Sequence, residues 1–294
     1  YFFIFGFYII SMITQQELDK FITDALLEDV HEGDHSSLAS IDATAQGKAR
    51  LLVKDNGILC GLEVAKAIFD KVDSQLQMEV HISEGAPIKC GDIAFHVYGS
   101  AISILTAERL VLNCMQRMSG IATKTNEYAK IIEGTNAKVI DTRKTTPNIR
   151  FLEKYAVTVG GGSNHRFGLY DMIMLKDNHI DFCGGITKAV QKVHEYLKAN
   201  QMNLRIEVET RNIENVKELM ACGGIDRIML DNYTPEKVKE AVELINGKYE
   251  TEASGGITLE TIRAYAETGV DFISVGALTH SVRSLDLSLK AEIN

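Results

Sequence analysis

The second half of the chain alternates short apolar runs with amphipathic helical patterns. We expect six strands there, at residues 138–140, 172–175, 204–208, 227–230, 249–253 and 272–275. Helical patterns follow several of them, at residues 213–222, 235–245 and 259–268. Serial alternation of strand and helix implies a parallel sheet, most simply a (β/α) barrel. Because only six strands are clear, the barrel is expected to be incomplete or open on one side.

The first half of the chain has a different pattern. Residues 14–30 carry apolar side chains at helical spacing, and Thr14 with Glu17 forms a candidate capping box at the start of that helix. Residues 33–37 are typical of a turn. Strand-like runs fill residues 46–95, with a helix at 62–72 among them. This pattern predicts a small α/β domain with a largely antiparallel sheet.

A long amphipathic helix is expected between the two halves. Residues 103–118 place Ile104, Ala107, Val111, Met115 and Met118 on one apolar face. Gly120 is a plausible end of this helix. Arg109 lies off the apolar face, where a solvated arginine is the ordinary interpretation.

Composition limits the possible functions. The 294 residues carry a formal net charge of -9, which argues against general nucleic-acid binding and against an anionic membrane surface. The five cysteines are scattered, form no CxxC pair and show no metal-binding spacing, so we expect reduced thiols in a cytosolic protein. Residues 1–11 are apolar but too short to span a bilayer as a helix, and they lack the flanks of a secretory signal. We interpret them as an upstream extension or a start-site artefact.

Polar or glycine residues follow every predicted strand of the second half. In chain order they are Arg143 and Lys144, Lys176, Glu209, Asp231, Ser254 with Gly255 and Gly256, and Gly276. In a (β/α) barrel all of these positions face the carboxyl rim, where such barrels carry their sites. One basic turn alone is equally consistent with a solvated loop, but their concurrence at every strand end favours a functional site.

Charge divides this predicted rim into two halves. The cationic half suits a ligand with several carboxylate or phosphate oxygens and contains Arg143, Lys144, His165, Arg166 and Lys176. Glu209 and Asp231 form the acidic half. Two carboxylates near phosphates suggest Mg²⁺, although they could also be charge partners for the neighbouring basic groups.

Glycine-rich turns at the rim suit phosphate. Ser254-Gly255-Gly256 precedes a helix expected to start near Thr258, so backbone N–H groups and the helix end could hold a phosphate there. Gly276 could complete this site. Residues 160–162 are three glycines that would place His165 and Arg166 in a tight loop.

Together, these segments resemble the quinolinate phosphoribosyltransferases, or nicotinate-nucleotide pyrophosphorylases (carboxylating), of the type II phosphoribosyltransferase family. The likeness covers the chain from about Thr14 to its C-terminus. The residues that carry it are Asp141-Thr142-Arg143-Lys144-Thr145-Thr146-Pro147, Gly160-Gly161-Gly162-Ser163-Asn164-His165-Arg166, Leu175-Lys176-Asp177-Asn178-His179, Glu207-Val208-Glu209, Leu230-Asp231-Asn232, Ser254-Gly255-Gly256-Ile257, and Glu108-Arg109 with Leu112-Asn113 and Ser119-Gly120.

The resemblance implies an α/β fold with an N-terminal α/β sandwich domain and an incomplete or open (β/α) barrel. We expect the sandwich domain at residues 12–117, with residues 282–294 as a candidate addition to it, and the catalytic barrel at residues 118–281. It also implies a homodimer, as a candidate building block of a higher oligomer, in which Arg109 reaches the partner's site. No nucleic-acid or membrane partner is expected.

The resemblance further implies roles for the rim residues. Arg143, His165, Arg166, Lys176 and a partner-chain Arg109 would bind the two carboxylates of quinolinate. Lys144 would lie between quinolinate and phosphoribosyl diphosphate. Glu209 and Asp231 would work with Mg²⁺, partly through water, and the 5-phosphate would contact Ser254, Gly255, Gly256 and Gly276. Lys144, Glu209 and Asp231 are the expected catalytic residues.

The implied reaction makes nicotinate mononucleotide, diphosphate and CO₂ for NAD synthesis. One alternative is nicotinate phosphoribosyltransferase, which forms the same product without decarboxylation. Because a monocarboxylate needs fewer cations, the number of basic groups favours quinolinate. A second alternative, from a different class, is a non-catalytic sensor of phosphoribosyl diphosphate. That interpretation needs a damaged metal or cationic set, whereas Glu209, Asp231 and Lys144 are all present.

Overall fold

The computed structural model describes residues 14–292, so the predicted extension at residues 1–11 lies outside the described residues. The described chain divides into two compact units. The first unit contains residues 14–126, 145–161 and 278–292, and the second contains residues 127–144 and 162–277.

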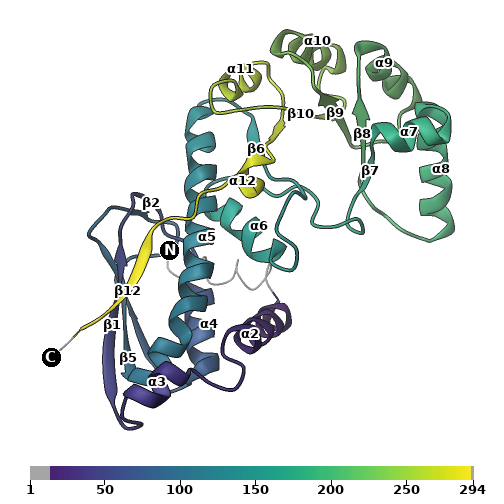
Figure 1. The fold of residues 1–294 in the computed structure, drawn as a ribbon. Coiled ribbons are helices and arrows are strands. Elements are labelled where there is room, and N and C mark those ends of the chain that lie inside the picture. Colours follow the sequence, from purple (N-terminus) through teal and green to yellow (C-terminus); the bar gives the residue numbers. More distant parts are fainter. Residues whose placement is uncertain (1–13, 293–294) are drawn as a thin grey trace. The chain divides into compact units, whose positions relative to one another are not determined.

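A four-stranded sheet is the centre of the first unit (Figure 1). Its strand order is β12-β1-β5-β3, with β1 at Gln46–Val53, β3 at Gln77–Val80, β5 at Ile93–Ser100 and β12 at Leu287–Ala291. All three pairings are antiparallel. The short strands β2 (Gly57–Ile58) and β4 (Pro87–Ile88) form a separate antiparallel pair. The predicted antiparallel sheet is confirmed.

Four helices of the first unit lie at α2 (Gln15–Asp29), α3 (His35–Ser40), α4 (Leu62–Val72) and α6 (Arg150–Val159). The capping box that begins α2 is present: the side chain of Thr14 accepts from the N–H of Glu17, and the Glu17 carboxylate accepts from the N–H of Thr14. The prediction of a plain turn at residues 33–37 is wrong. Asp34 accepts hydrogen bonds from the N–H groups of Ser36 and Ser37, and this cap starts the short helix α3.

Helix α5 spans Ala101–Ile131, so the prediction that it ends at Gly120 is wrong. Glycine has another purpose here. A Cβ atom on Gly120 would lie 2.4 Å from the carbonyl oxygen of Arg283. The chain that leads into β12 therefore packs directly on the helix backbone, and only glycine permits this close approach.

The second unit contains a six-stranded sheet in the order β6-β11-β10-β9-β8-β7, and every pairing in it is parallel. Its strands are β6 (Lys138–Ile140), β7 (Ile173–Leu175), β8 (Ile206–Thr210), β9 (Arg227–Asp231), β10 (Glu250–Ser254) and β11 (Phe272–Ser274). All six predicted strands are confirmed. Within the described residues β6 and β7 are the two ends of the sheet and do not pair, so the barrel is open.

Helices accompany these strands at α7 (Asp177–Cys183), α8 (Ile186–Ala199), α9 (Ile213–Cys222), α10 (Pro235–Ile245) and α11 (Ile262–Ala266). Helix α12 (Ala277–His280) begins at the last residue of the second unit, and its residues 278–280 belong to the first. The two faces of the sheet differ. One carries fully buried apolar side chains such as Val208, Ile228 and Ala253. The alternate positions carry buried charges such as Glu207 and Glu252. The charged face is the one that bears the predicted site.

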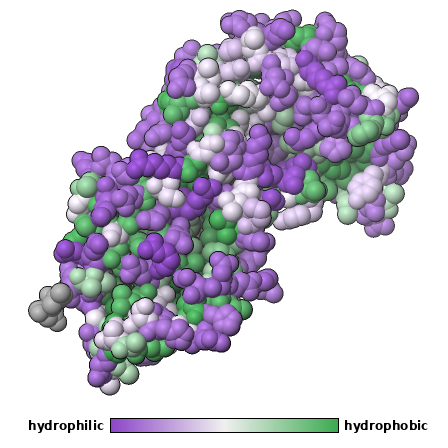
Figure 2. Space-filling view, viewed as in Figure 1, coloured by the Kyte–Doolittle hydropathy of each residue, from purple (hydrophilic) through white to green (hydrophobic). Residues whose placement is uncertain are grey.

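The surface carries both polar and apolar side chains. Hydrophilic and hydrophobic side chains are interspersed on the face shown in Figure 2, and hydrophilic ones predominate over the second unit. No helix among residues 14–292 has the length and apolar character needed to span a membrane.

Candidate active site

The sheet of the second unit brings most of the predicted site residues to one edge. Because all six strands are parallel, their carboxyl ends meet there. The residues at or just after these ends are, in sheet order from β6 to β7, Arg143, Gly276, Ser254, Asp231, Glu209 and Lys176. Ser254 and Asp231 are direct neighbours in the register of β10 and β9.

Buried Asp141 holds the loop that carries His165 and Arg166. Its Oδ1 accepts the backbone N–H of His165 at 2.8 Å, and its Oδ2 accepts the side-chain amide of Asn164 at 2.6 Å. Ser163 also forms an isolated parallel bridge with Ile140 of β6. The loop therefore continues the sheet beside β6, and this places His165 against the charged face.

His165 completes a buried ionic cluster. Its Nε2 lies 2.9 Å from Glu207 on β8 and 3.3 Å from Glu252 on β10. Arg227 on β9 donates to Glu252 at 3.1 Å and to Glu250 at 2.9 Å. The side chains of Glu207 and Glu252 are fully buried. Buried charges persist only when opposite charges compensate them, so this cluster fixes the imidazole in one place.

Proton affinities in this cluster follow from burial and charge. Burial alone would lower the pKa of His165, but Glu207 and Glu252 outweigh it and raise this pKa to about 9. Burial, aided by the charge of Glu252, raises the pKa of Glu207 to about 7. With a pKa of about 9 the imidazole is a cation near neutral pH, and its Nε2 proton faces the two carboxylates.

The spacing of His165, Glu207 and Glu252 would also permit a metal ion. The positive guanidinium of Arg227 lies 3.1 Å from Glu252 and 3.9 Å from Glu207, where it already supplies a compensating charge. A protonated imidazole supplies the other. We therefore interpret the cluster as a support for His165.

Two guanidinium groups form the cationic part of the edge. Burial and the charge of Arg143 lower the pKa of Arg166, so the two groups lie close together. Nε of Arg143 is buried and has no hydrogen-bond partner within residues 14–292. Arg166 is fixed by a bond from Nη1 to the carbonyl of Met172 at 3.1 Å. Two neighbouring positive groups, one of which has a buried N–H without a hydrogen-bond partner, are suited to binding an anion.

Glu209 and Asp231 form the acidic part. Burial and the charge of Asp231 raise the pKa of Glu209, and the charge of Lys176 acts in the opposite direction. These three side chains are therefore near neighbours. Two carboxylates that repel one another fit a divalent cation, since the cation would remove their repulsion.

The glycine turn after β10 is tightly built. Gly255 has a φ of +100°, and a Cβ atom there would lie 2.2 Å from the side-chain oxygen of Asn232. Gly256 has a φ of +62° and open space beside it. The expected helix start near Thr258 is wrong: α11 begins at Ile262, and the N–H of Thr258 donates to Thr261. The backbone can still approach an anion at this turn.

Two further predicted residues are exposed side chains. Lys144 is exposed, and its backbone N–H donates to Thr142 at 3.1 Å. Arg109 is exposed on α5 in the first unit. The structure thus brings together His165, Glu207 and Glu252 on one side, Arg143 and Arg166 on another, and Glu209 with Lys176 and Asp231.

Sequence reasoning missed the roles of Glu207, Arg227 and Glu252. A signal for them was present. Fully buried parallel strands are normally continuous apolar runs. Charges at alternate positions of 205–209, 227–231 and 250–254 should therefore have indicated a charged interior face.

Comparisons with known proteins identify the family of the chain. The family models for the N-terminal and C-terminal domains of quinolinate phosphoribosyl transferase match residues 34–119 and 121–290. Quinolinate phosphoribosyltransferase (decarboxylating) 2b of Nicotiana tabacum, a mitochondrial protein by its name, is 45% identical, with 94% of this chain and 82% of the relative covered.

A probable nicotinate-nucleotide pyrophosphorylase (carboxylating) of Bacillus subtilis is 43% identical, with 95% of this chain and 94% of the relative covered. NadC from Streptococcus pyogenes, a solved structure, has a TM-score of 0.90 at 41% identity and covers 95% of this chain and 97% of its own. The chain belongs to the quinolinate phosphoribosyltransferase family.

Proposed function

We propose that this protein joins quinolinate to phosphoribosyl diphosphate and releases diphosphate and CO₂, forming nicotinate mononucleotide for NAD synthesis. The observation that carries the proposal is the pair of neighbouring guanidinium groups, Arg143 and Arg166, with the buried free donor on Arg143. Family membership and the parallel strand ends support the same conclusion.

Each carboxylate of quinolinate has a cationic partner in this proposal. Arg143 and Arg166 bind the carboxylates through charge-assisted hydrogen bonds, and Lys176 adds a third positive charge. His165 holds a proton on Nε2 because of the buried carboxylates behind it. A monocarboxylate such as nicotinate would leave part of this set without an anionic partner, including the buried Nε of Arg143.

Phosphoribosyl diphosphate occupies the neighbouring strand ends. Ser254, Gly255, Gly256 and Gly276 hold the 5-phosphate, because glycine lets backbone N–H groups come close to it. Glu209 and Asp231 would hold Mg²⁺, partly through water, and when bound it would neutralise negative charge on the diphosphate. The mutual repulsion of these two carboxylates supports that assignment.

The reaction begins when the pyridine nitrogen attacks C1 of the ribose and the C1–O bond to diphosphate breaks, with its electron pair leaving on diphosphate. The ring nitrogen is now positive. The bond between C2 and its carboxylate then breaks, CO₂ leaves, and the electron pair stays on C2 next to that positive nitrogen. A protonated group supplies a proton to C2, and we propose Lys144 for this step. The protein contributes chiefly placement and charge.

The assembly and location are part of the same proposal. We propose a cytoplasmic homodimer, as a building block of a higher oligomer, in which Arg109 of one chain contacts quinolinate bound to its partner. Exposure of Arg109 on α5 supports this role, since a solvated arginine is available to a second chain.

Quinolinate labelled in the 2-carboxylate tests the reaction. Purified protein with Mg²⁺ and phosphoribosyl diphosphate should release labelled CO₂ in step with nicotinate mononucleotide. Turnover of nicotinate in place of quinolinate would support the non-decarboxylating alternative. Binding of phosphoribosyl diphosphate without turnover of either acid would support a sensor.

A further inference from the structure

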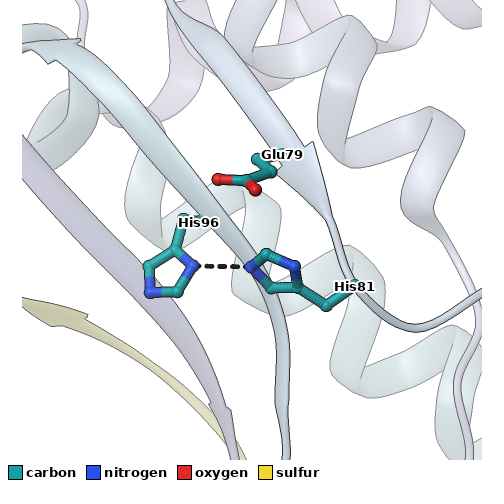
Figure 3. A group of neighbouring side chains, drawn as sticks. All are labelled: Glu79, His81 and His96. Atoms are coloured by element: carbon teal, nitrogen blue, oxygen red, sulfur yellow. Dashed lines mark hydrogen bonds between the residues drawn. The ribbon is translucent and has the colours of Figure 1, made fainter.

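A cluster of two histidines and a glutamate lies on the first unit, far in sequence from the buried cluster of His165, Glu207 and Glu252 (Figure 3). Glu79 is on β3, His81 directly follows that strand, and His96 is on β5. The register pairs Glu79 with His96, and the N–H of His81 donates to the carbonyl of Ala94. Backbone pairing therefore brings the three side chains to one face of the sheet.

The three side chains converge closely. Nε2 of His81 lies 2.6 Å from Nδ1 of His96, and the two ring nitrogens share a hydrogen bond. One ligand atom from each of Glu79, His81 and His96 lies within 4.8 Å of the others. Glu79 and His81 are exposed and His96 is half-buried, so an ion from solvent can reach them.

Outer partners orient two of these ligands. Nε2 of His96 faces the carboxylate of Glu292 at 3.5 Å. A proton on Nε2 leaves Nδ1 with a free lone pair directed at His81. Tyr98 donates to Glu79 at 2.8 Å. A carboxylate behind a histidine is the usual support of a metal-binding imidazole, because it fixes the tautomer and the ring orientation.

We propose that Glu79, His81 and His96 bind a divalent transition-metal ion of the Zn²⁺ type. Two imidazoles and one carboxylate are a common zinc ligand set, with water at the remaining position. Imidazole ligands select Zn²⁺, Ni²⁺ or Cu²⁺ over Mg²⁺, which prefers oxygen. The ion takes the place of the proton that the two rings share.

Only a small movement is needed to admit the ion. Ligand nitrogens about 2.1 Å from a tetrahedral zinc ion lie roughly 3.4 Å apart, so the rings must separate by less than an ångström. Lys48 and Arg50 bring positive charge to this face, but both pair with Glu292, at 2.7 Å and 3.1 Å. Bound metal would fasten β3, the last strand of the sheet, to β5.

Zinc binding by the full-length chain tests the proposal. Zn²⁺ is titrated against a chromogenic chelator in excess Mg²⁺, which saturates oxygen-rich sites. The His81→Gln and His96→Gln variants keep a hydrogen-bonding side chain at exposed or half-exposed positions, and circular dichroism confirms that they fold. His194→Gln, an exposed histidine on α8, is the matched control.

Wild type and His194→Gln should bind one more Zn²⁺ ion per chain than either test variant, and Zn²⁺ should raise their thermal unfolding temperature. Glu292→Gln should weaken this site by about tenfold, as expected for an outer partner of a ligand. Equal zinc stoichiometry and affinity in wild type, His81→Gln and His96→Gln would overturn the proposal. So would the absence of saturable zinc binding by wild type.

Discussion

The two sheets of this protein differ in whether their charged side chains are exposed to solvent or buried. In the antiparallel sheet of the first unit, charged side chains such as Lys48 and Glu292 remain accessible, and their ion pairs lie against solvent. In the parallel sheet of the second unit, Glu207, Arg227 and Glu252 are buried. Surface pairs cost little and contribute little, whereas buried charges must be compensated. The buried set therefore indicates where the fold has been adapted to a charged ligand.

The largest effect should follow removal of Arg143, the arginine after β6 whose Nε has no hydrogen-bond partner within residues 14–292. Arg143→Ala should weaken quinolinate binding by about 10³-fold, since truncating one member of a buried charge pair costs roughly 2–5 kcal/mol. Calorimetric titration with quinolinate measures it. The control, Arg205→Ala, removes an exposed arginine of the same unit and should bind normally. Unchanged affinity in Arg143→Ala would remove this residue from the site.

The acidic pair should separate binding from turnover. Glu209→Ala should reduce turnover by at least about a hundredfold through loss of Mg²⁺ binding, while quinolinate still binds. Steady-state kinetics across a Mg²⁺ series, together with quinolinate titration, distinguishes the two effects. Glu214→Ala, an exposed glutamate on α9, is the control. Wild-type turnover in Glu209→Ala would exclude a role for the carboxylate.

Stability should depend on pH through the buried cluster. The pKa of His165 is about 9 in the folded protein, above its usual value of about 6.5. The protonated imidazole therefore contributes up to about 3 kcal/mol to the free energy of unfolding. This contribution is complete below about pH 6.5 and is lost as pH rises through 9. Glu252→Gln should reduce that dependence, because it removes one of the two carboxylates that hold the proton on His165. Urea unfolding of both proteins at several pH values measures it, and parallel curves would contradict the account.

The smallest effect should come from a surface pair in the first unit. Lys20 and Asp24 lie 2.5 Å apart on α2 but are 76% and 62% exposed. Asp24→Ala should change the free energy of unfolding by about 0.5 kcal/mol or less. Urea unfolding measures this change in the free energy of unfolding for Asp24→Ala and for Glu252→Gln. If Asp24→Ala lost as much stability as Glu252→Gln, the contrast between exposed and buried charges would be removed.

Local patterns in the sequence predicted much of the fold. The six parallel strands and the capping box of Thr14 were recognisable because periodicity and capping act over a few residues. The continuation of α5 through Gly120 was not, since the glycine there permits contact with Arg283, far along the chain, and does not end the helix. The start of α11 was placed about four residues too early, because the carbonyl of Thr258 first accepts from the N–H groups of Thr261 and Ile262 in a turn, and the helix begins at Ile262.

The candidate site divides in the same way. Arg143, Glu209 and Asp231 could be proposed because each follows a predicted strand. The alternating charges of β8, β9 and β10 could have indicated a charged face, but which of them meet at His165 could not be predicted, because the cluster joins three segments through side chains. Its discovery needed the register of β8, β9 and β10.

The central claim is that the second unit binds a dicarboxylate through a preformed cationic set. Titrating wild-type protein with quinolinate and with nicotinate, without phosphoribosyl diphosphate, tests it most directly. The account predicts that quinolinate binds at least about a hundredfold more tightly, because its second carboxylate adds a charge-assisted contact. Equal affinity for the two acids would contradict it.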